Sequence, residues 1–422
     1  FLMAPESKTG SESAGAPKSF IALRHPAARM YLIGAALAMM ADSVEHVISY
    51  WMIYEKFQSP ALAGFAVISH WLPFLLFSFW SGSLADRFDP RRIIQLGMVL
   101  FMLVSAGWGV LFWLDTLEVW HAAVLLVIHG FAGVLWAPAA QLFIHAIVGE
   151  GQLQSAIRTM ASSRTLGLLF GPAVGGGLLL TFGPTIAIFL NILIYLPLTL
   201  WLFRAPEQPK EETIQKRAMS GFSDVIDTLR DLATNRLVIS MTILAGATSL
   251  IVGNAHQAQM PEFAHDLGEG DAGFRYSILL TANAAGALFA GIVLESRGLL
   301  PANPRTAFIL ALMWCCAIGG FAVSTNYFLS ISLLLCAGFL DLSFNSMART
   351  IAQLNAPANM RGRAIGLFNV SSQGLRTFSG ITIGLGGSVI GIHYSLAISA
   401  ALLIVVILSL FSYFRMARLR DE

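Results

Sequence analysis

Twelve apolar runs, most of them more than twenty residues long, dominate this sequence and restrict what it can fold into. A helix needs about 20 apolar residues to cross a bilayer. Only helices and closed barrels satisfy every backbone group in lipid. We therefore predict an all-α membrane protein with twelve transmembrane helices. The predicted spans are residues 28–53, 61–84, 92–113, 120–147, 152–180, 183–203, 236–260, 272–296, 306–324, 328–354, 361–390 and 392–415.

The composition excludes several other classes of protein. Charged residues make up 12% of the chain, against about 25% in soluble domains. A net charge of +2 is too small to indicate a nucleic-acid partner. The three cysteines, Cys315, Cys316 and Cys336, form neither a disulfide framework nor a metal-binding spacing. The sequence lacks a Walker phosphate loop, so we predict that the chain does not hydrolyse ATP. We also predict no other enzyme activity and no bound cofactor or metal.

The loops between the runs differ in charge and predict an orientation. Lys and Arg gather in alternate loops, and the other set contains only Lys56 and Arg275 as basic residues. Basic loops stay in the cytoplasm. Both termini are therefore expected in the cytoplasm of a multi-pass protein of the bacterial inner membrane, with the lipid bilayer as a partner.

The two halves of the chain resemble each other. Gly130-Phe131 in the fourth run matches Gly338-Phe339 in the tenth, 208 residues later. Parallel repeats of this kind build transporters whose binding site lies between the repeats. The predicted organisation is a cytoplasmic tail (1–27), a six-helix bundle (28–203), a cytoplasmic linker (204–235), a second six-helix bundle (236–415) and a second tail (416–422). Within the linker, the stretch from Phe222 to Leu232 is amphipathic and is expected to form a short surface helix.

The loop between the second and third runs reads Gly82-Ser-Leu-Ala-Asp86-Arg87-Phe-Asp89-Pro90-Arg91-Arg92. It resembles the signature loop of the major facilitator superfamily, except that the family usually has Gly at Asp89 and a basic residue at Pro90. The resemblance implies a twelve-helix transporter that works as a monomer on a small-molecule substrate. It also implies that Gly82, Asp86, Arg87, Arg91 and Arg92 form a gate between the two halves.

The fifth run contains a glycine motif that also points to this superfamily. Gly171-Pro172-x-x-Gly175-Gly176 resembles a motif of drug–proton antiporters, which favours efflux and implies that these residues also belong to the gate. Its alternative is a packing seam of small residues. Further stretches resemble the enterobactin-exporter and macrolide-efflux branch. They are Gln58-Ser-Pro-Ala-Leu62, Leu72-Pro73, Trp136-Ala-Pro-Ala139 and Arg361-Gly-Arg-Ala364.

Ionisable residues inside the runs are candidates for the mechanism, because a charge at mid-membrane is costly. Asp42, Glu45 and His46 share one face of the first helix. Arg164, Asp341 and Arg376 lie at similar depths, so the acids and the arginines could neutralise each other across a central cavity. Asp42, Glu45 and Asp341 are the predicted carriers of a coupled proton.

Other polar and aromatic residues are expected to bind the substrate. The predicted set is His46, Tyr50, Trp136, Arg164, Asn254, Gln257, Asn345 and Arg376. The remaining histidines, His70, His129 and His256 among them, are expected to be separate packing residues.

The predicted function is proton-coupled antiport that exports a siderophore or another amphipathic small molecule by alternating access. Three alternatives remain open. A divalent-metal exporter could use the donors of Asp42, Glu45 and His46. A phospholipid or lysophospholipid flippase could hold a head group with arginine. The chain could also be a membrane receptor or scaffold that transports nothing.

Overall fold

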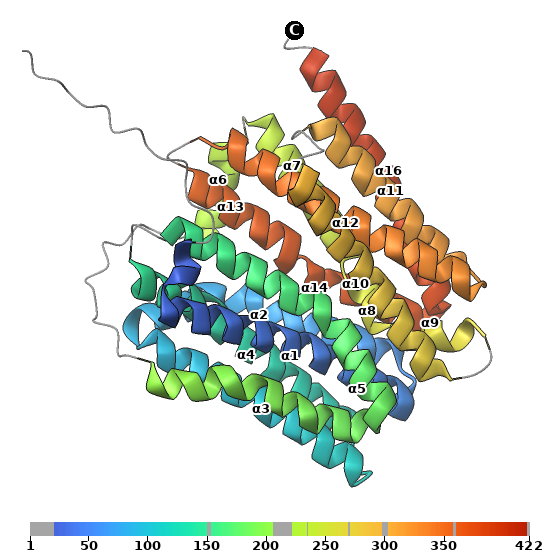
Figure 1. The fold of residues 1–422 in the computed structure, drawn as a ribbon. Helices are drawn as coiled ribbons and strands as arrows, with labels where there is room; N and C mark the ends of the chain where they lie inside the picture. Colours follow the sequence, from blue (N-terminus) through green and yellow to red (C-terminus); the bar gives the residue numbers. More distant parts are fainter. Residues whose placement is uncertain are drawn as a thin grey trace, which may run out of the picture.

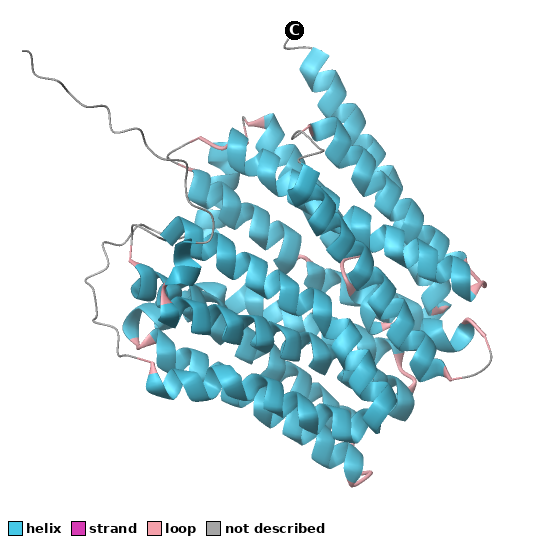
Figure 2. Ribbon diagram, in the orientation of Figure 1, coloured by secondary structure: helices cyan, strands magenta, loops and turns pink. Residues whose placement is uncertain are grey.

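The computed structural model describes residues 21–149, 153–205, 222–233, 235–268, 271–297, 303–357 and 360–419, and this part of the chain is built from helices (Figure 2). The helices of the N-terminal half are η1 (Ile21–Arg24), α1 (Pro26–Phe57), α2 (Pro60–Arg87), α3 (Pro90–Trp113), α4 (Val119–Val148) and α5 (Leu153–Arg204). The linker helix is α6 (Phe222–Leu232), as the amphipathic stretch predicts. The C-terminal half contains α7 (Arg236–Ile251), α8 (Ala255–Ala258), α9 (Met260–Asp266), α10 (Ala272–Arg297), α11 (Pro304–Val323), α12 (Tyr327–Asn355), α13 (Arg361–Asn369), η3 (Val370–Gly374), α14 (Arg376–Ser379), η4 (Gly380–Leu385), α15 (Gly386–Ile390) and α16 (Ile392–Leu419).

Ten of the described helices are long and apolar enough to cross a membrane. Two of the predicted spans merge into α5, which bends at Gly183, where φ is 72°. The predicted eleventh span is the succession α13–α15, in which two π-helical segments interrupt the α-helix. The helices are therefore consistent with the twelve predicted spans.

The predicted seventh span, 236–260, is not one continuous helix. The helix α7 ends at Ile251, and a turn leads into the short helices α8 and α9. Gly253 adopts a left-handed conformation there, with φ of 47°. Glycine has no Cβ and adopts that conformation without strain, so it allows the break.

Local sequence signals explain where several helices begin. Ser59 accepts a hydrogen bond from the backbone N–H of Leu62, and Pro60 opens α2. Asp89 accepts from the N–H of Arg91 in the same way, and Pro90 opens α3. A side-chain cap followed by proline in the first turn is a preferred helix start.

The helices form two bundles that lie side by side, the first drawn from blue to green and the second from yellow to red (Figure 1). Matching glycines hold a helix pair together in each bundle. A Cβ on Gly130 of α4 would lie 2.1 Å from the carbonyl oxygen of Ser69 in α2, and one on Gly338 of α12 would lie 1.9 Å from that of Asn283 in α10. The 208-residue offset therefore corresponds to one repeated backbone contact.

Described contacts join the two bundles near the end where α1 passes to α2. Gly64 of α2 lies directly against Gly380 and Gly384 of η4. The Tyr276 hydroxyl donates to the Val47 carbonyl at 2.7 Å, and the Gln259 amide donates to the Pro60 carbonyl at 2.8 Å. We call this the α1–α2 end.

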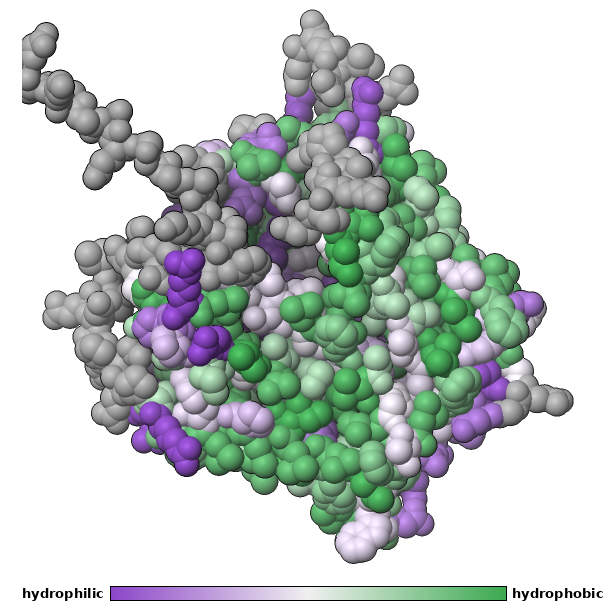
Figure 3. All heavy atoms as spheres, viewed as in Figure 1, coloured by the Kyte–Doolittle hydropathy of each residue, from purple (hydrophilic) through white to green (hydrophobic). Residues whose placement is uncertain are grey.

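Figure 3 shows polar side chains lining a recess near α6 and α13, while apolar residues cover most of the visible helix faces.

Candidate functional site

A buried cluster of ionisable side chains lies inside the N-terminal bundle. The His129 ring of α4 lies between the two carboxylates of α1. Its Nδ1 is 2.7 Å from Glu45 Oε1, and its Nε2 is 3.0 Å from Asp42 Oδ1. Asp42, Glu45 and His129 are 6%, 2% and 4% exposed. Buried charges require partners of this kind, because removing an ion from water costs several kcal/mol.

Two further helices fix the orientation of Glu45. The hydroxyl of Ser105, on α3, donates to Glu45 Oε2 at 2.6 Å. The side-chain amide of Asn191, on α5, donates to that hydroxyl at 3.4 Å. Glu45 therefore uses one oxygen for His129 and the other for Ser105, and the cluster connects α1, α3, α4 and α5.

His46 and His70 complete the cluster, and the expectation that His70 and His129 pack separately is corrected. His46 Nε2 lies 3.2 Å from Nδ1 of His70, on α2. The His46 ring centroid is 4.7 Å from the ring centroids of both His70 and His129. Counting residues from the ends of the predicted helices could have predicted that these three histidines lie at the same depth. His46, His70 and His129 lie eleven, ten and ten residues from the α1–α2 ends of their helices, or about 15 Å at 1.5 Å per residue.

The expected pairing of these acids with arginines is replaced by the contacts with His129. Arg164, on α5, instead places its guanidinium over the ring of Trp136, 5.2 Å from the centroid. Trp136 is buried and Arg164 is partly buried. The two residues were predicted separately for substrate binding, and the structure brings them together as a cation–π pair.

A second charged group belongs to the C-terminal bundle and reaches the first. Arg376, at the start of α14, places its guanidinium 5.2 Å from the ring centroid of Trp71, on α2. The positive charge of Arg376 attracts the negative charge of Asp341, on α12. Asp341 Oδ1 accepts a hydrogen bond from Asn345 at 2.9 Å. Of these predicted residues, Asp341 and Asn345 are therefore hydrogen-bonded, and Arg376 lies at the boundary between the bundles.

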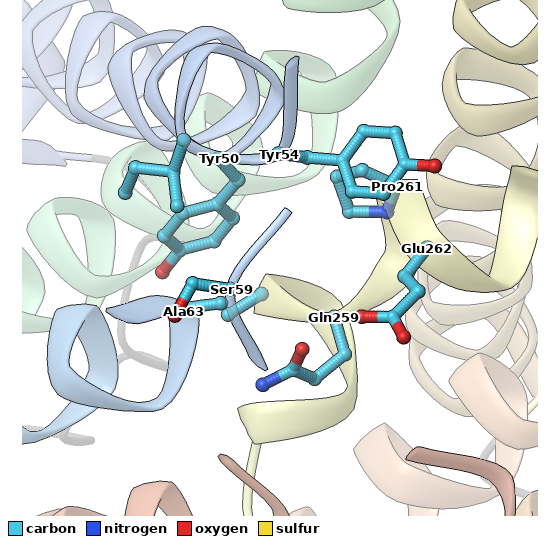
Figure 4. Close-up of a pocket in the computed structure, with 9 residues that line it drawn as sticks. Tyr50, Tyr54, Ser59, Ala63, Gln259, Pro261 and Glu262 are labelled. Atoms are coloured by element: carbon cyan, nitrogen blue, oxygen red, sulfur yellow. The ribbon is translucent and has the colours of Figure 1, made fainter. Parts of the chain in front are cut away.

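A small pocket lies between the bundles at the α1–α2 end (Figure 4). Tyr50 and Tyr54 of α1 face Gln259 and Glu262 of the α8–α9 segment across it. Tyr50 also packs edge-on against His46, with ring centroids 5.5 Å apart. Burial raises the pKa of Glu262, and a neighbouring negative charge adds to the increase.

The predicted residues at the α7–α8 break differ in their surroundings. Asn254 and Gln257 are partly buried. Within the described residues, the buried Oδ1 of Asn254 accepts no hydrogen bond, and neither ring nitrogen of His256 has a partner. These polar atoms lie close to the C-terminal bundle's contact with α2, so they remain candidates for substrate contact.

The signature loop is described in part. Arg91 is buried, and its guanidinium bonds to Asp89 and to the Ala205 carbonyl at the end of α5, the latter at 2.7 Å. Arg92 donates to the side-chain oxygen of Gln95 at 3.2 Å. The side chains of the other predicted gate residues lie outside the described part of the structure; they are Gly82, Asp86 and Arg87.

The glycine motif of α5 forms a packing surface on two sides. A Cβ on Gly171 would lie 2.3 Å from the Ser43 side chain of α1, and one on Gly175 would lie 3.0 Å from Val47. A Cβ on Gly176 would lie 2.7 Å from Ser277, on α10 of the other bundle. The motif therefore packs α5 against α1 and also forms part of the contact between the bundles. Pro172, the proline of the motif, lies inside α5.

The two helical bundles with charged groups inside and between them define a multi-pass membrane transporter rather than an enzyme. The sequence profile of the Major Facilitator Superfamily matches residues 31–381, and the chain belongs to this family. The resemblance in the signature loop is thereby confirmed.

Curated relatives and solved structures agree with this assignment. The enterobactin exporter EntS of Shigella boydii is 27% identical over 350 residues, which cover 81% of this chain and 80% of the relative. EntS of Escherichia coli is equally similar. A bacterial homologue of the human lysosomal transporter Spinster, in an inward-facing and unoccupied conformation, superposes with a TM-score of 0.70 at 13% identity and covers 96% of this chain and 99% of its own. The nucleoside transporter NupG gives 0.69 at 13% identity over 92% and 99%. These two structures show the same fold.

Proposed function

We propose that this chain is a proton-coupled exporter of an amphipathic small molecule with an anionic group, of the siderophore class. It works by alternating access in the bacterial inner membrane, as a monomer with both termini in the cytoplasm. The similarity to enterobactin exporters and the glycine motif of α5 support export. The transmembrane proton gradient supplies the energy, and no cofactor is needed.

One observation carries this proposal: an arginine of one bundle stacks on an aromatic ring of the other. Arg376 acts on Asp341 within the C-terminal bundle and stacks on Trp71 of the N-terminal bundle. When the bundles rock, Trp71 moves relative to Arg376, and the surroundings of Asp341 change. Coupling requires such a change, since a group with the same proton affinity in both conformations couples nothing.

Asp341 therefore becomes our first candidate for the proton carrier. It is partly exposed, and its described hydrogen bond comes from the Asn345 side chain. Asp42 and Glu45 are buried and both contact His129. The sequence-based assignment of the proton to Asp42 or Glu45 stays a prediction, and the same experiment tests it.

The substrate chemistry follows from the two cation–π pairs. Arg164 over Trp136 and Arg376 over Trp71 each offer a positive charge beside a flat apolar surface. A ligand with aromatic rings and acidic hydroxyl or carboxyl groups can satisfy both features. Siderophores of the catecholate type have this combination.

Transport by the purified chain in proteoliposomes tests the proposal, with iron-free enterobactin as the probe. An imposed pH gradient should drive its movement in the wild type. Asp341→Asn should abolish gradient-driven movement and retain probe exchange at equal pH. Asp227→Asn, on the exposed face of α6, is the matched control and should transport normally.

Three outcomes would change the assignment. An equal rate of probe movement with and without the pH gradient would contradict proton coupling. Loss of coupling in Glu45→Gln but not in Asp341→Asn would identify an α1 carboxylate as the proton carrier. Movement of fluorescent phospholipid without movement of enterobactin would favour the flippase alternative.

A further inference from the structure

The hydrogen bonds of two histidines in the cluster leave lone pairs that face one another. His46 Nδ1 lies 2.7 Å from the backbone carbonyl oxygen of Asp42, which can only accept, so this nitrogen carries the hydrogen. His129 Nδ1 bonds to Glu45 Oε1 at 2.7 Å in the same sense. The hydrogen bond of one ring nitrogen determines the state of the other. In the neutral rings, Nε2 of His46 and Nε2 of His129 therefore keep their lone pairs.

These two nitrogens belong to a group of three histidines. One nitrogen from each of His46, His70 and His129 lies within 4.8 Å of those from the other two rings. Asp42 Oδ1 is 3.0 Å from His129 Nε2, an ion-pair distance. A carboxylate oxygen and a ring lone pair repel each other at that distance, so this position requires a cation: a proton on Nε2, or a metal ion that takes its place.

We propose that His46, His70, His129 and Asp42 bind one divalent first-row transition-metal ion, with Zn²⁺ the best match. Three imidazole nitrogens and one carboxylate oxygen form a four-ligand set that suits Zn²⁺, whereas Mg²⁺ and Ca²⁺ prefer oxygen ligands. The ion takes the place of the hydrogen shared by His46 and His70. Small ring movements close the set around it.

The net charge of the loaded site supports this assignment. With all three imidazoles neutral, the negative charges of Asp42 and Glu45 balance the two positive charges of the ion. An electroneutral cluster suits a membrane interior, where uncompensated charge is costly. The described ion pairs of Asp42 and Glu45 are with histidines.

Residues around the ligands already have the arrangement of an outer shell. Glu45 holds the far nitrogen of His129, and Ser105 and Asn191 hold Glu45 in turn. The Asp42 carbonyl holds the far nitrogen of His46. Metal-ligating histidines almost always donate their other N–H to a carboxylate or a carbonyl. The His46 side chain is 21% exposed, which leaves a route for the ion to enter.

Calorimetry on the purified, chelator-stripped full chain in detergent tests the proposal with Zn²⁺ alone. We expect one ion per chain. Glu45→Gln should weaken binding about 10–100-fold, as loss of an outer-shell partner does. His70→Gln and His129→Gln should weaken it by more. His121→Gln, which alters a histidine beside Trp120 outside the cluster, should bind like the wild type.

X-ray absorption on the Zn²⁺-loaded wild type supplies a second readout that needs no variant. Imidazole and carboxylate ligands at about 2.0–2.1 Å in a four-coordinate shell are the expected result. If His129→Gln fails to fold, His70→Gln decides, because His70 is only partly buried and holds no carboxylate in the described contacts. An oxygen-only shell, no bound ion in the wild type, or undiminished binding in His70→Gln would overturn the proposal. None of these measurements uses transport, so failure of the exporter assignment would leave the result unaffected.

Discussion

The two bundles repeat a backbone contact but contain different chemistry. Gly130 and Gly338 each press a helix against a neighbouring carbonyl group. The residue before Gly130 is His129, which binds two carboxylates, whereas the residue before Gly338 is the small apolar Ala337. The repeat therefore preserves the positions where backbones approach closely, and side chains at neighbouring positions have diverged.

The charged groups of the two bundles also differ in their exposure. The cluster around His129 is formed by five helices of one bundle, α1 to α5. Asp341 and Arg376 are both partly exposed, and Arg376 stacks on Trp71 across the boundary. A group enclosed within one rigid bundle keeps its surroundings when the bundles rock, but a group at their boundary does not. This difference is why we propose ion binding at the first group and coupling at the second.

The largest expected effect is a difference in how much each charged group contributes to the stability of the protein. His129→Leu removes the shared partner of Asp42 and Glu45 and leaves two carboxylates buried together. We expect a loss of about 3–5 kcal/mol in the free energy of unfolding. Arg376→Met should cost less, because partly exposed Asp341 keeps contact with water. Thermal unfolding in detergent, followed by tryptophan fluorescence, measures both. Equal losses would contradict the contrast between the bundles.

The next effect compares the hydrogen bonds that support each acid. Ser105→Ala removes a donor from fully buried Glu45 and should cost about 1.5–3 kcal/mol, as for bonds to charged groups. Asn345→Ala removes the donor to Asp341, and water can replace it there, so the expected cost is below about 1 kcal/mol. The same unfolding assay applies. A larger loss for Asn345→Ala than for Ser105→Ala would show that exposure does not control these costs.

A third test examines the contact that the bundles share. Gly130→Ala and Gly338→Ala each place a Cβ about 2 Å from a carbonyl oxygen, and we expect similar losses of about 1–3 kcal/mol. Gly177→Ala is the control, because a Cβ there meets nothing within 4 Å. It should change stability by less than about 0.5 kcal/mol. If only one of the two glycines is sensitive, the repeat does not extend to this contact.

The smallest effect concerns Glu262 at the rim of the pocket. Burial raises its pKa above the ordinary value of 4.5, Asp266 adds to the increase, and His393 and His265 oppose it. As the pH rises through this window, the unfolded chain loses the Glu262 proton first, so the wild type loses stability. Glu262→Gln should remove that loss, worth less than about 1 kcal/mol for a half-exposed group, and match the wild type below pH 4.5. Unfolding temperatures measured across this pH range test it, and parallel curves for the two proteins would contradict the assignment.

The sequence predicted the features that depend on one helix at a time. Apolar runs located the spans, the Ser59-Pro60 and Asp89-Pro90 pairs marked helix starts, and amphipathic spacing predicted α6. Helical periodicity also placed Asp42, Glu45 and His46 on one face of α1. These features follow from local backbone geometry and from the thickness of the bilayer, which apply before any helix meets another.

Only the tertiary structure decided which helices those faces meet. Periodicity gives the direction of a side chain relative to its own helix axis, but the rotation and neighbours of that helix come from close packing at glycines such as Gly171 and Gly130. Packing turned the α1 carboxylates toward His129 rather than toward an arginine. It also placed Arg376 on a tryptophan of the other bundle. Depth along each helix could be counted from the sequence, whereas the partner at that depth depends on contacts between different helices, such as that of Glu45 with His129, 84 positions apart.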